Sequence, residues 1–233
     1  MLASDTQNSL SVVETYDFRV PSASTNLIAG PSGSGKSVRV ANILRHKNSY
    51  IKNGVNIKNV IFCYAAWQDL YDELDKENIV TQWVDQLPTN DQFIELVCPY
   101  KDNGGSICVI DDYMTEINKD LVKIVSVSSR HYNTTTFILQ QSLFPANPLG
   151  RQISLNVKFI YLLKSPRDIS ALSFLARQIY GPQFHWVIAA YHEATKNPYS
   201  CLVLDLSQET PSELRVRSNV LPSEFPMIIW MKS

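Results

Sequence analysis

The chain has 233 residues, of which 45% are hydrophobic and 18% are charged, and its formal net charge is −1. That length and apolar fraction suffice for one large domain with a buried core, and they exclude a disordered chain. The near-zero net charge excludes a protein that coats nucleic acid by bulk positive charge, although it leaves room for a local basic patch.

The N-terminal segment, residues 1–20, is polar and has neither the basic start nor the apolar stretch of a secretory signal. We interpret residues 1–20 as an N-terminal arm and residues 21–233 as one domain. Every apolar run in the chain is shorter than a membrane-spanning helix needs, so we expect no insertion into a membrane. Together these features predict an intracellular protein that is not secreted.

Short apolar runs rich in β-branched and aromatic residues predict strands, and amphipathic segments between them predict helices. The predicted strands cover Thr25–Ala29, Asn59–Ala65, Ser106–Ile110, Thr135–Leu139, Lys158–Leu163 and Ser200–Leu206. The predicted helices cover Lys36–His46, Asp69–Glu77, Asp91–Leu96, Asn118–Ser129 and Arg167–Tyr180. This alternation predicts an α/β fold with a mainly parallel central sheet and helices on both faces. After residue 181 the chain is more strand-like, which predicts a C-terminal strand extension of the same domain.

The strongest motif in the chain lies between the first predicted strand and the first predicted helix. Its residues are Gly30, Pro31, Ser32, Gly33, Ser34, Gly35, Lys36 and Ser37, and they match the phosphate-binding pattern G-x-x-x-x-G-K-[ST]. In that pattern the glycines allow a tight turn whose N–H groups point at phosphate oxygens. The lysine reaches the β- and γ-phosphates, and the serine hydroxyl binds Mg²⁺. The sequence therefore predicts a P-loop that binds ATP and Mg²⁺.

A second motif ends the strand predicted at Ser106–Ile110, where Asp111 and Asp112 follow an apolar run. This is the Walker B pattern, in which Asp111 holds Mg²⁺ and Asp112 orients or deprotonates the attacking water. An ordinary Asp-rich turn has the same residues, but the upstream P-loop favours the functional interpretation. The strand-like segment Asn59–Ala65 lies between the two motifs, which favours a RecA-like NTPase with an inserted strand over a kinase or GTPase.

Polar and basic residues farther along the chain are candidates for sensing and stabilising the transferred phosphate. Gln141 follows the predicted strand Thr135–Leu139, and a polar residue at such a strand end can contact the γ-phosphate. An ATPase that hydrolyses ATP at a subunit interface also needs an arginine to neutralise charge on the transferred phosphoryl group. The basic candidates are Arg130, Arg151, Lys164, Arg167 and Arg177, and spacing alone does not choose among them.

These motifs together resemble those of the viral genome-packaging ATPases of the FtsK–HerA superfamily, especially those of poxvirus-like large DNA viruses, virophages and Polinton-type elements. The resemblance runs from about Asn26 to Asn219. Besides the P-loop and Walker B motifs, it rests on the segments Ser129–Asn133, Phe137–Phe144, Ile153–Asn156, Lys164–Asp168 and Leu202–Asn219. It implies an ATP-driven motor that translocates double-stranded DNA into a viral capsid and hydrolyses Mg-ATP between the subunits of a pentameric or hexameric ring.

The resemblance also implies roles for individual residues. Lys36 and Ser37 bind Mg-ATP, Asp111 holds the metal, Asp112 is the catalytic acid and Gln141 is the sensor. Many superfamily members carry Glu at the position of Asp112. The resemblance places the arginine that acts on the neighbouring subunit at Arg167, with Arg130 as second choice. It further implies sequence-independent DNA contacts in the pore, a capsid or membrane-vertex partner, and a site of action in the infected cell or the virion.

Two other functions fit the same P-loop core. A nucleoside or small-molecule kinase would use the arginines between Arg167 and Arg177 in a mobile lid, but a strand that ends in Gln argues against it. A nucleotide switch with little turnover has no need of Asp112 or of an arginine finger. If the protein is a motor, two segments are candidates for the loop that lines the pore: Ala66–Gln86 and Asn147–Arg151. DNA-stimulated hydrolysis separates the motor from both alternatives.

Overall fold

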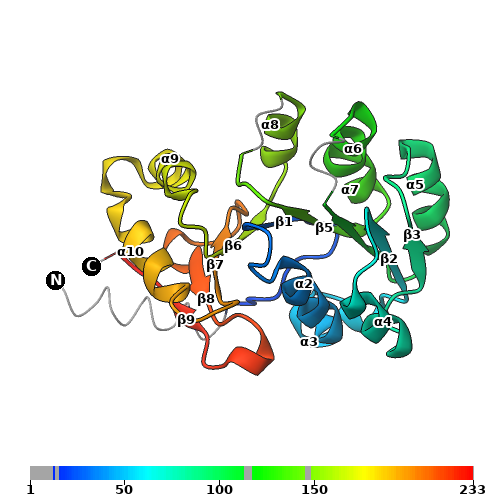
Figure 1. The fold of residues 1–233 in the computed structure, drawn as a ribbon, viewed down its shortest axis with the longest axis horizontal. Helices are drawn as coiled ribbons and strands as arrows, with labels where there is room; N and C mark the ends of the chain where they lie inside the picture. The colour runs from blue at the N-terminus through cyan, green and yellow to red at the C-terminus, as the bar shows by residue number, and fades with distance from the viewer. Residues whose placement is uncertain (1–12, 14–15, 113–116, 145–147, 233) are drawn as a thin grey trace.

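A computed structural model describes residues 13, 16–112, 117–144 and 148–232 of the chain. Within them, the strands form a single sheet in the order β3-β2-β4-β5-β1-β6-β7-β8-β9 (Figure 1). The strands are β1 (Thr25–Ala29), β2 (Asn59–Tyr64), β3 (Gln82–Val84), β4 (Ser106–Asp111), β5 (Thr134–Gln140), β6 (Phe159–Leu163), β7 (Cys201–Asp205), β8 (Val216–Ser218) and β9 (Ile228–Ile229). Strands β1 to β6 pair in parallel, and β7, β8 and β9 continue the sheet antiparallel.

This topology confirms the predicted α/β fold with a mainly parallel sheet and a C-terminal strand extension. All the predicted strands are present within a residue or two of their expected bounds. Strands β3, β8 and β9 were not predicted, because runs of two or three residues are too short to carry an alternating pattern. No helix in the described part of the chain combines the length and the apolarity that crossing a membrane requires.

The strand inserted between the two motifs differs from the one that chain order suggested. In the sheet, β5 lies between β1, which leads into the P-loop, and β4, which ends at Asp111. Strand β2 pairs on the far side of β4 instead. The prediction of an inserted strand is therefore confirmed, but its assignment to the segment Asn59–Ala65 is wrong. Crossover connections separate chain order from sheet order, so sequence alone did not give the neighbour.

Helices cover both faces of the sheet (Figure 1). One face carries α2 (Lys36–Arg45), α3 (Lys47–Tyr50) and α4 (Asp69–Lys76), and the other carries α5 (Asn90–Val97), α6 (Lys119–Lys123), α7 (Ser129–His131), α8 (Pro148–Ser154), α9 (Ile169–Tyr180) and α10 (His185–Ala194). The helix predicted at Asn118–Ser129 is α6 continued by a π-helical turn, Ile124–Ser128, into α7. Helix α10 lies in the region after residue 181 that was predicted to be strand-like. The prediction missed this helix because its aromatic and β-branched run Trp186–Ile188 resembles a strand locally.

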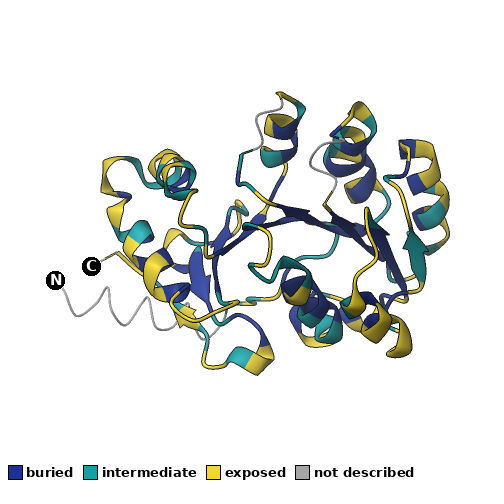
Figure 2. Cartoon of the chain, in the orientation of Figure 1, coloured by how far each residue is buried: buried dark blue, intermediate teal, exposed yellow. Residues whose placement is uncertain are grey.

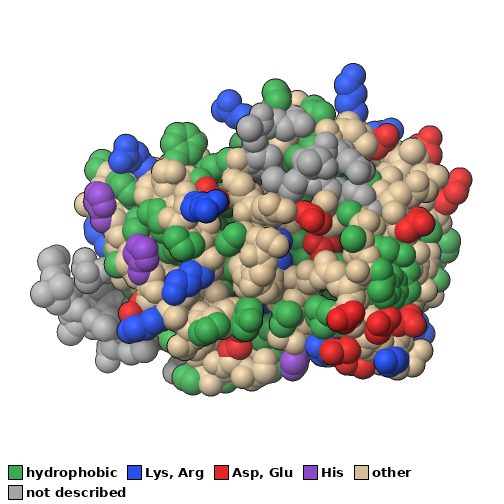
Figure 3. Space-filling view, in the orientation of Figure 1, with side chains coloured by type: hydrophobic (Ala, Val, Ile, Leu, Met, Phe, Trp, Pro, Cys, Tyr) green, Lys and Arg blue, Asp and Glu red, His purple; other side chains and the backbone are tan. Residues whose placement is uncertain are grey.

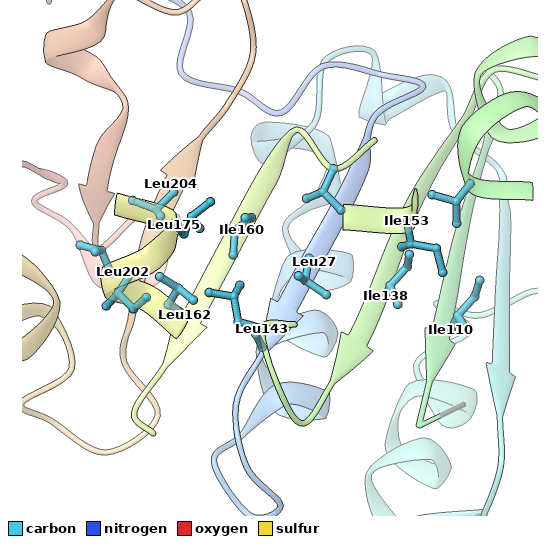
Figure 4. Packing of buried hydrophobic residues seen from close by; sticks show 14 of the residues in the cluster. Leu27, Ile110, Ile138, Leu143, Ile153, Ile160, Leu162, Leu175, Leu202 and Leu204 are labelled. Atoms are coloured by element: carbon cyan, nitrogen blue, oxygen red, sulfur yellow. The ribbon is translucent and has the colours of Figure 1, made fainter. Parts of the chain in front are cut away.

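Alternate residues of each central strand pack on opposite faces, which gives two separate cores. Leu27 and Ile110 face α5 to α10, whereas Ile28 and Val109 face α2 to α4. Figure 4 shows the first core, where Leu27, Ile138 and Ile160 lie in a row across neighbouring strands. Figure 2 shows the central strands buried throughout, while the helices expose only their outer faces. The strands are thus fixed on both sides, which makes the sheet edge a rigid support for the loops that follow.

The described part of the predicted N-terminal arm contacts the domain. The Tyr16 hydroxyl lies 2.8 Å from the Thr210 hydroxyl, and Val20 forms an isolated bridge with Ile51. Most of residues 1–15 lie outside the described residues. The boundary between an arm and a domain at residue 20 stays a prediction.

Candidate functional site

The predicted site residues converge on one edge of the sheet because parallel strands end at the same edge. The P-loop follows β1, Asp111 ends β4, and Gln141 follows β5 directly. The register brings the strand ends level, since Ala29 pairs with Gln140 and Leu139 pairs with Asp111. Segments separated by up to about a hundred residues in the chain therefore meet, at the edge where ligands bind in open α/β sheets.

The P-loop wraps the beginning of α2 in the conformation that its glycines allow. Gly33 and Gly35 have positive φ values of 75° and 96°, which favour glycine. The Gly30 N–H donates to the Gln140 carbonyl at 3.0 Å, which anchors the loop to the neighbouring strand. The Ser34 hydroxyl is buried and has no hydrogen-bond partner among the residues that the structure describes. A loop shaped around phosphate oxygens leaves such a polar group for its ligand.

Lys36 bends back over the loop that precedes it. Its Nζ donates to the carbonyl oxygens of Gly30 at 2.9 Å and Pro31 at 3.1 Å. Burial lowers the pKa of the Lys36 ammonium, while the carboxylates of Asp111 and Asp112 act in the opposite direction. Backbone carbonyls are weaker partners for an ammonium than phosphate oxygens. The lysine is therefore held beside the loop by contacts that a phosphate can replace.

Ser37 and Asp111 form the oxygen pair that the motifs predicted. The Ser37 hydroxyl donates to Asp111 Oδ2 at 2.9 Å, and Asp111 is only 3% exposed. Burial raises the pKa of the Asp111 carboxyl, and its hydrogen bonds and the charge of Lys36 partly offset that rise. A hydroxyl and a carboxylate are ligands that Mg²⁺ prefers, and this ion commonly takes few protein ligands together with phosphates. These residues therefore fit a Mg²⁺ site that the nucleotide completes.

The structure adds Tyr71, a residue that sequence reasoning missed. It lies in α4, is fully buried, and its hydroxyl donates to Asp111 Oδ2 at 2.6 Å. Burial and the neighbouring Asp111 carboxylate raise the pKa of Tyr71, so its hydroxyl stays protonated and remains a donor. In the sequence this tyrosine is simply an apolar-face residue of an amphipathic helix. No motif spacing connects it to the Walker B strand.

Asp112 and Gln141 lie on the open side of the same edge. Gln141 Nε2 donates to Asp112 Oδ1 at 3.3 Å, and both side chains are exposed. Asp112 has a φ of 62°, in the left-handed region that only a few residue types tolerate. The turn after β4 thus points the two adjacent acids in different directions, with Asp111 toward the interior and Asp112 toward solvent. That separation lets one acid bind metal while the other meets water.

A pocket of about 450 Å³ joins these side chains. It is lined by Ser32, Gly33, Gly35, Lys36, Ser37, Val38, Gln68, Asp69, Leu70, Asp111, Asp112, Gln141 and Tyr199. Most of the predicted site residues are in this set, so the structure brings the P-loop, both acids and the predicted sensor around one hollow. The loop before α4 and Tyr199, just before β7, were not predicted to take part.

The two candidate arginines lie in different places. Arg167 is exposed and lines a second hollow of about 550 Å³, which shares Ser32 and Gln141 with the first. The loop that carries Arg167 is bonded to the segment after Gln141, because Asp168 Oδ2 accepts from the Leu143 N–H at 2.9 Å. Arg130 is also exposed, but it lies in α7 before the amino end of β5. The structure therefore places Arg167, and not Arg130, beside the P-loop of its own chain.

The sheet topology, the P-loop and the Walker B strand define the fold of a P-loop NTPase. No protein-family model matches the chain, and no curated protein matches it.

Among solved structures, the DNA-packaging ATPase B204 of Sulfolobus turreted icosahedral virus is similar with a TM-score of 0.55 and 14% identity, covering 81% of this chain and 95% of that one. The genome-packaging NTPase B204 of Sulfolobus turreted icosahedral virus 2, solved with AMPPCP, has a TM-score of 0.47 and 16% identity over 80% of this chain and 94% of that one. The first likeness shows a shared fold, which agrees with the resemblance drawn from the motifs.

Proposed function

We propose that the chain is an ATP-driven motor that moves double-stranded DNA into a viral capsid. The observation that carries the proposal is the convergence of P-loop, buried acid, exposed acid and glutamine at one sheet edge, with β5 inserted between β1 and β4. The fold shared with a viral DNA-packaging ATPase supports the packaging role. A switch protein needs only the phosphate-binding half of this arrangement.

The buried half of the site binds the nucleotide. Lys36 leaves the carbonyls of Gly30 and Pro31 and contacts the β- and γ-phosphates, while the N–H groups at the start of α2 hold the remaining oxygens. Ser37 and Asp111 are the residues that would hold Mg²⁺, which when bound neutralises charge on the phosphates. Tyr71 keeps the Asp111 carboxylate in one orientation.

The exposed half of the site performs hydrolysis. Asp112 accepts a proton from the attacking water, and Gln141 holds Asp112 through its amide hydrogen bond. Because Gln141 follows β5 and also borders the hollow that Arg167 lines, a change at the γ-phosphate reaches the Arg167 loop. The hydrogen bond from the Leu143 N–H to Asp168 Oδ2 joins the segment after Gln141 to the Arg167 loop, and it is a physical route by which hydrolysis in one subunit alters the surface offered to the next.

Assembly into a ring supplies the positive charge that the phosphates still need, from an arginine of the neighbouring subunit. In a pentameric or hexameric ring, an exposed arginine of one subunit reaches the phosphates bound by its neighbour and stabilises the transition state. The resemblance makes Arg167 the first choice and Arg130 the second, and both arginines are exposed. The ring acts inside the infected cell, in the cytoplasm or viral factory or on the virion, and docks on a capsid or membrane-vertex protein.

Charge favours one of the two candidate pore segments. Ala66–Gln86 holds six acidic residues and one lysine, and Figure 3 shows acidic side chains gathered over α4. Such a surface repels DNA phosphates. In the second candidate, Asn147 lies outside the described residues, but α8 carries the exposed Arg151. We therefore assign DNA contact to α8, through phosphates and without base reading.

Steady-state ATP hydrolysis, measured with and without double-stranded DNA, tests the proposal. We expect DNA to stimulate the wild-type protein several-fold, and Arg151→Ala to lose most of that stimulation while basal hydrolysis is kept. The matched control is Arg45→Ala, which removes a partly exposed arginine from the face that carries α4. We expect this control to respond to DNA as the wild type does.

Hydrolysis that ignores DNA in the assembled protein contradicts the motor and favours the kinase or switch. Assembly is checked in the same samples by light scattering. Stimulation that survives in Arg151→Ala contradicts the assignment of α8 but leaves the motor standing.

A further inference from the structure

Tyr199 is an aromatic residue whose position core packing does not explain. It lies in the turn between α10 and β7, the residue is 60% exposed, and it lines the pocket beside the P-loop. Its φ is 63°, in the left-handed region that a bulky residue adopts only at a cost in free energy. A large ring that is both exposed and held in a strained conformation is a mark of a binding site.

A buried arginine fixes Tyr199 to the P-loop helix. Arg39 lies in α2, two residues after Ser37, and is only 4% exposed. Its Nη2 donates to the Tyr199 carbonyl at 3.0 Å, and its Nη1 lies 2.6 Å from Glu224 Oε1 in the C-terminal extension. The backbone of Tyr199 is therefore fastened to the helix that begins at the candidate phosphate site.

The ring lies directly against the P-loop. A Cβ added at Gly35 would stand 2.6 Å from Tyr199 Cδ1, so only glycine allows this approach. Val38, in the first turn of α2, lines the same pocket and is 43% exposed. Two apolar surfaces thus face solvent in the pocket that Lys36 and Ser37 also line.

We propose that Tyr199 stacks on the base of the bound nucleoside triphosphate and that Val38 provides an apolar contact beside it. The inference rests on the proposed nucleotide site and extends it from the phosphates to the base. Aromatic stacking uses the π-face that every base has, so the slot formed by Tyr199 and Val38 takes the base without reading its edge. Arg39 and Glu224 act as positioning residues: Arg39 donates to the Tyr199 carbonyl and pairs with Glu224, whose other carboxylate oxygen accepts from the Leu221 N–H.

Calorimetric titration with two probes tests the slot. Mg-ATP carries a base and Mg-tripolyphosphate does not, so stacking on Tyr199 affects only the first. In Tyr199→Asn we expect affinity for Mg-ATP to fall about fivefold to a hundredfold, the usual range for one base–aromatic stack. Asn tolerates the left-handed conformation, which keeps the turn intact. Affinity for Mg-tripolyphosphate should stay within about twofold of the wild type.

Three further variants serve as controls. Tyr199→Phe keeps the ring and should keep the wild-type affinity for Mg-ATP. Phe174→Ala removes an aromatic that is 58% exposed but lies in α9 outside the pocket, and should also leave affinity unchanged. Lys36→Ala should weaken both probes, because it acts on the phosphates.

The outcomes separate the slot from the nucleotide site itself. Unchanged Mg-ATP affinity in Tyr199→Asn overturns the stacking proposal. Equal losses for both probes also overturn it, since they show that Tyr199 shapes the P-loop and does not bind the base. A wild-type protein that binds neither probe overturns the proposed nucleotide site, and the slot with it.

Discussion

The parallel half of the sheet and its C-terminal extension hold their charged groups in opposite ways. At the carboxyl edge, Lys36 rests on backbone carbonyls and Asp112 meets Gln141 at 3.3 Å, so these groups have exchangeable partners. In the extension, Arg217 and Asp205 are 2% and 1% exposed and lie 2.7 Å apart. The difference shows where the fold keeps charge for binding and where it keeps charge for structure.

The extension should lose stability when its buried pair is broken. Arg217→Met leaves the Asp205 carboxylate buried with only neutral hydrogen-bond partners such as Thr210. Because an unpaired buried charge is costly, we expect the free energy of unfolding to fall by about 3–5 kcal/mol. Urea denaturation measures it.

The matched control for that variant is the exposed pair of Arg45 and Glu77. Arg45→Ala should cost less than about 1 kcal/mol, because solvent screens the pair. Equal losses in the two variants would contradict the distinction between a structural and a surface pair.

The site should lose activity and keep stability when its lysine is removed. Lys36→Ala deletes a charge that stabilises the phosphates, and we expect hydrolysis to fall about a hundredfold to a thousandfold. The free energy of unfolding should change little, since burial already disfavours the charged ammonium in the folded chain. A large fall in stability with modest loss of activity would reverse the comparison. Hydrolysis and urea denaturation on the same preparation decide it.

Tyr71 should affect the binding of Mg²⁺ and the acid limb of the pH dependence of hydrolysis. Tyr71→Phe removes the hydrogen bond that lowers the pKa of Asp111, so that pKa rises further above its usual value. We expect the Mg²⁺ concentration for half-maximal hydrolysis to rise about tenfold and the acid limb to move to higher pH. Tyr50→Phe is the control, since its buried hydroxyl meets Tyr161 away from the site. An unchanged Mg²⁺ requirement in Tyr71→Phe would contradict this role.

The charged Asp111 carboxylate should lower the free energy of unfolding at neutral pH. Its pKa is raised on folding, so the folded state binds the proton more tightly, and ionisation destabilises the fold as the pH rises above the ordinary carboxyl range. Asp111→Asn should therefore raise the free energy of unfolding at pH 7 by about 0.5–2 kcal/mol while removing hydrolysis. The gain should vanish below about pH 3, under the ordinary carboxyl pKa, where the wild-type carboxyl is protonated in both the folded and the unfolded state. A gain independent of pH would contradict an ionic cause.

Sequence and structure agree most closely where local signals are strong. The P-loop residues Gly30–Ser37 and the acids after β4 were predicted because strand, loop and helix signals coincide there. Tyr71 and Tyr199 were missed because each reaches the site through tertiary packing, from a helix face and from a turn near the C-terminal extension. The neighbour of β1 in the sheet was likewise decided by crossover connections.

The most direct test of a ring motor mixes two inactive subunits in the presence of DNA. Arg167→Ala keeps an intact P-loop, and Lys36→Ala keeps an intact Arg167. If Arg167 serves the neighbouring subunit, about a quarter of the interfaces in an equal mixture combine an intact P-loop with an intact arginine, and hydrolysis returns. If the mixture stays as inactive as either variant alone, although the subunits assemble together, Arg167 does not act across the interface. That result would contradict the ring motor with Arg167 as its shared arginine.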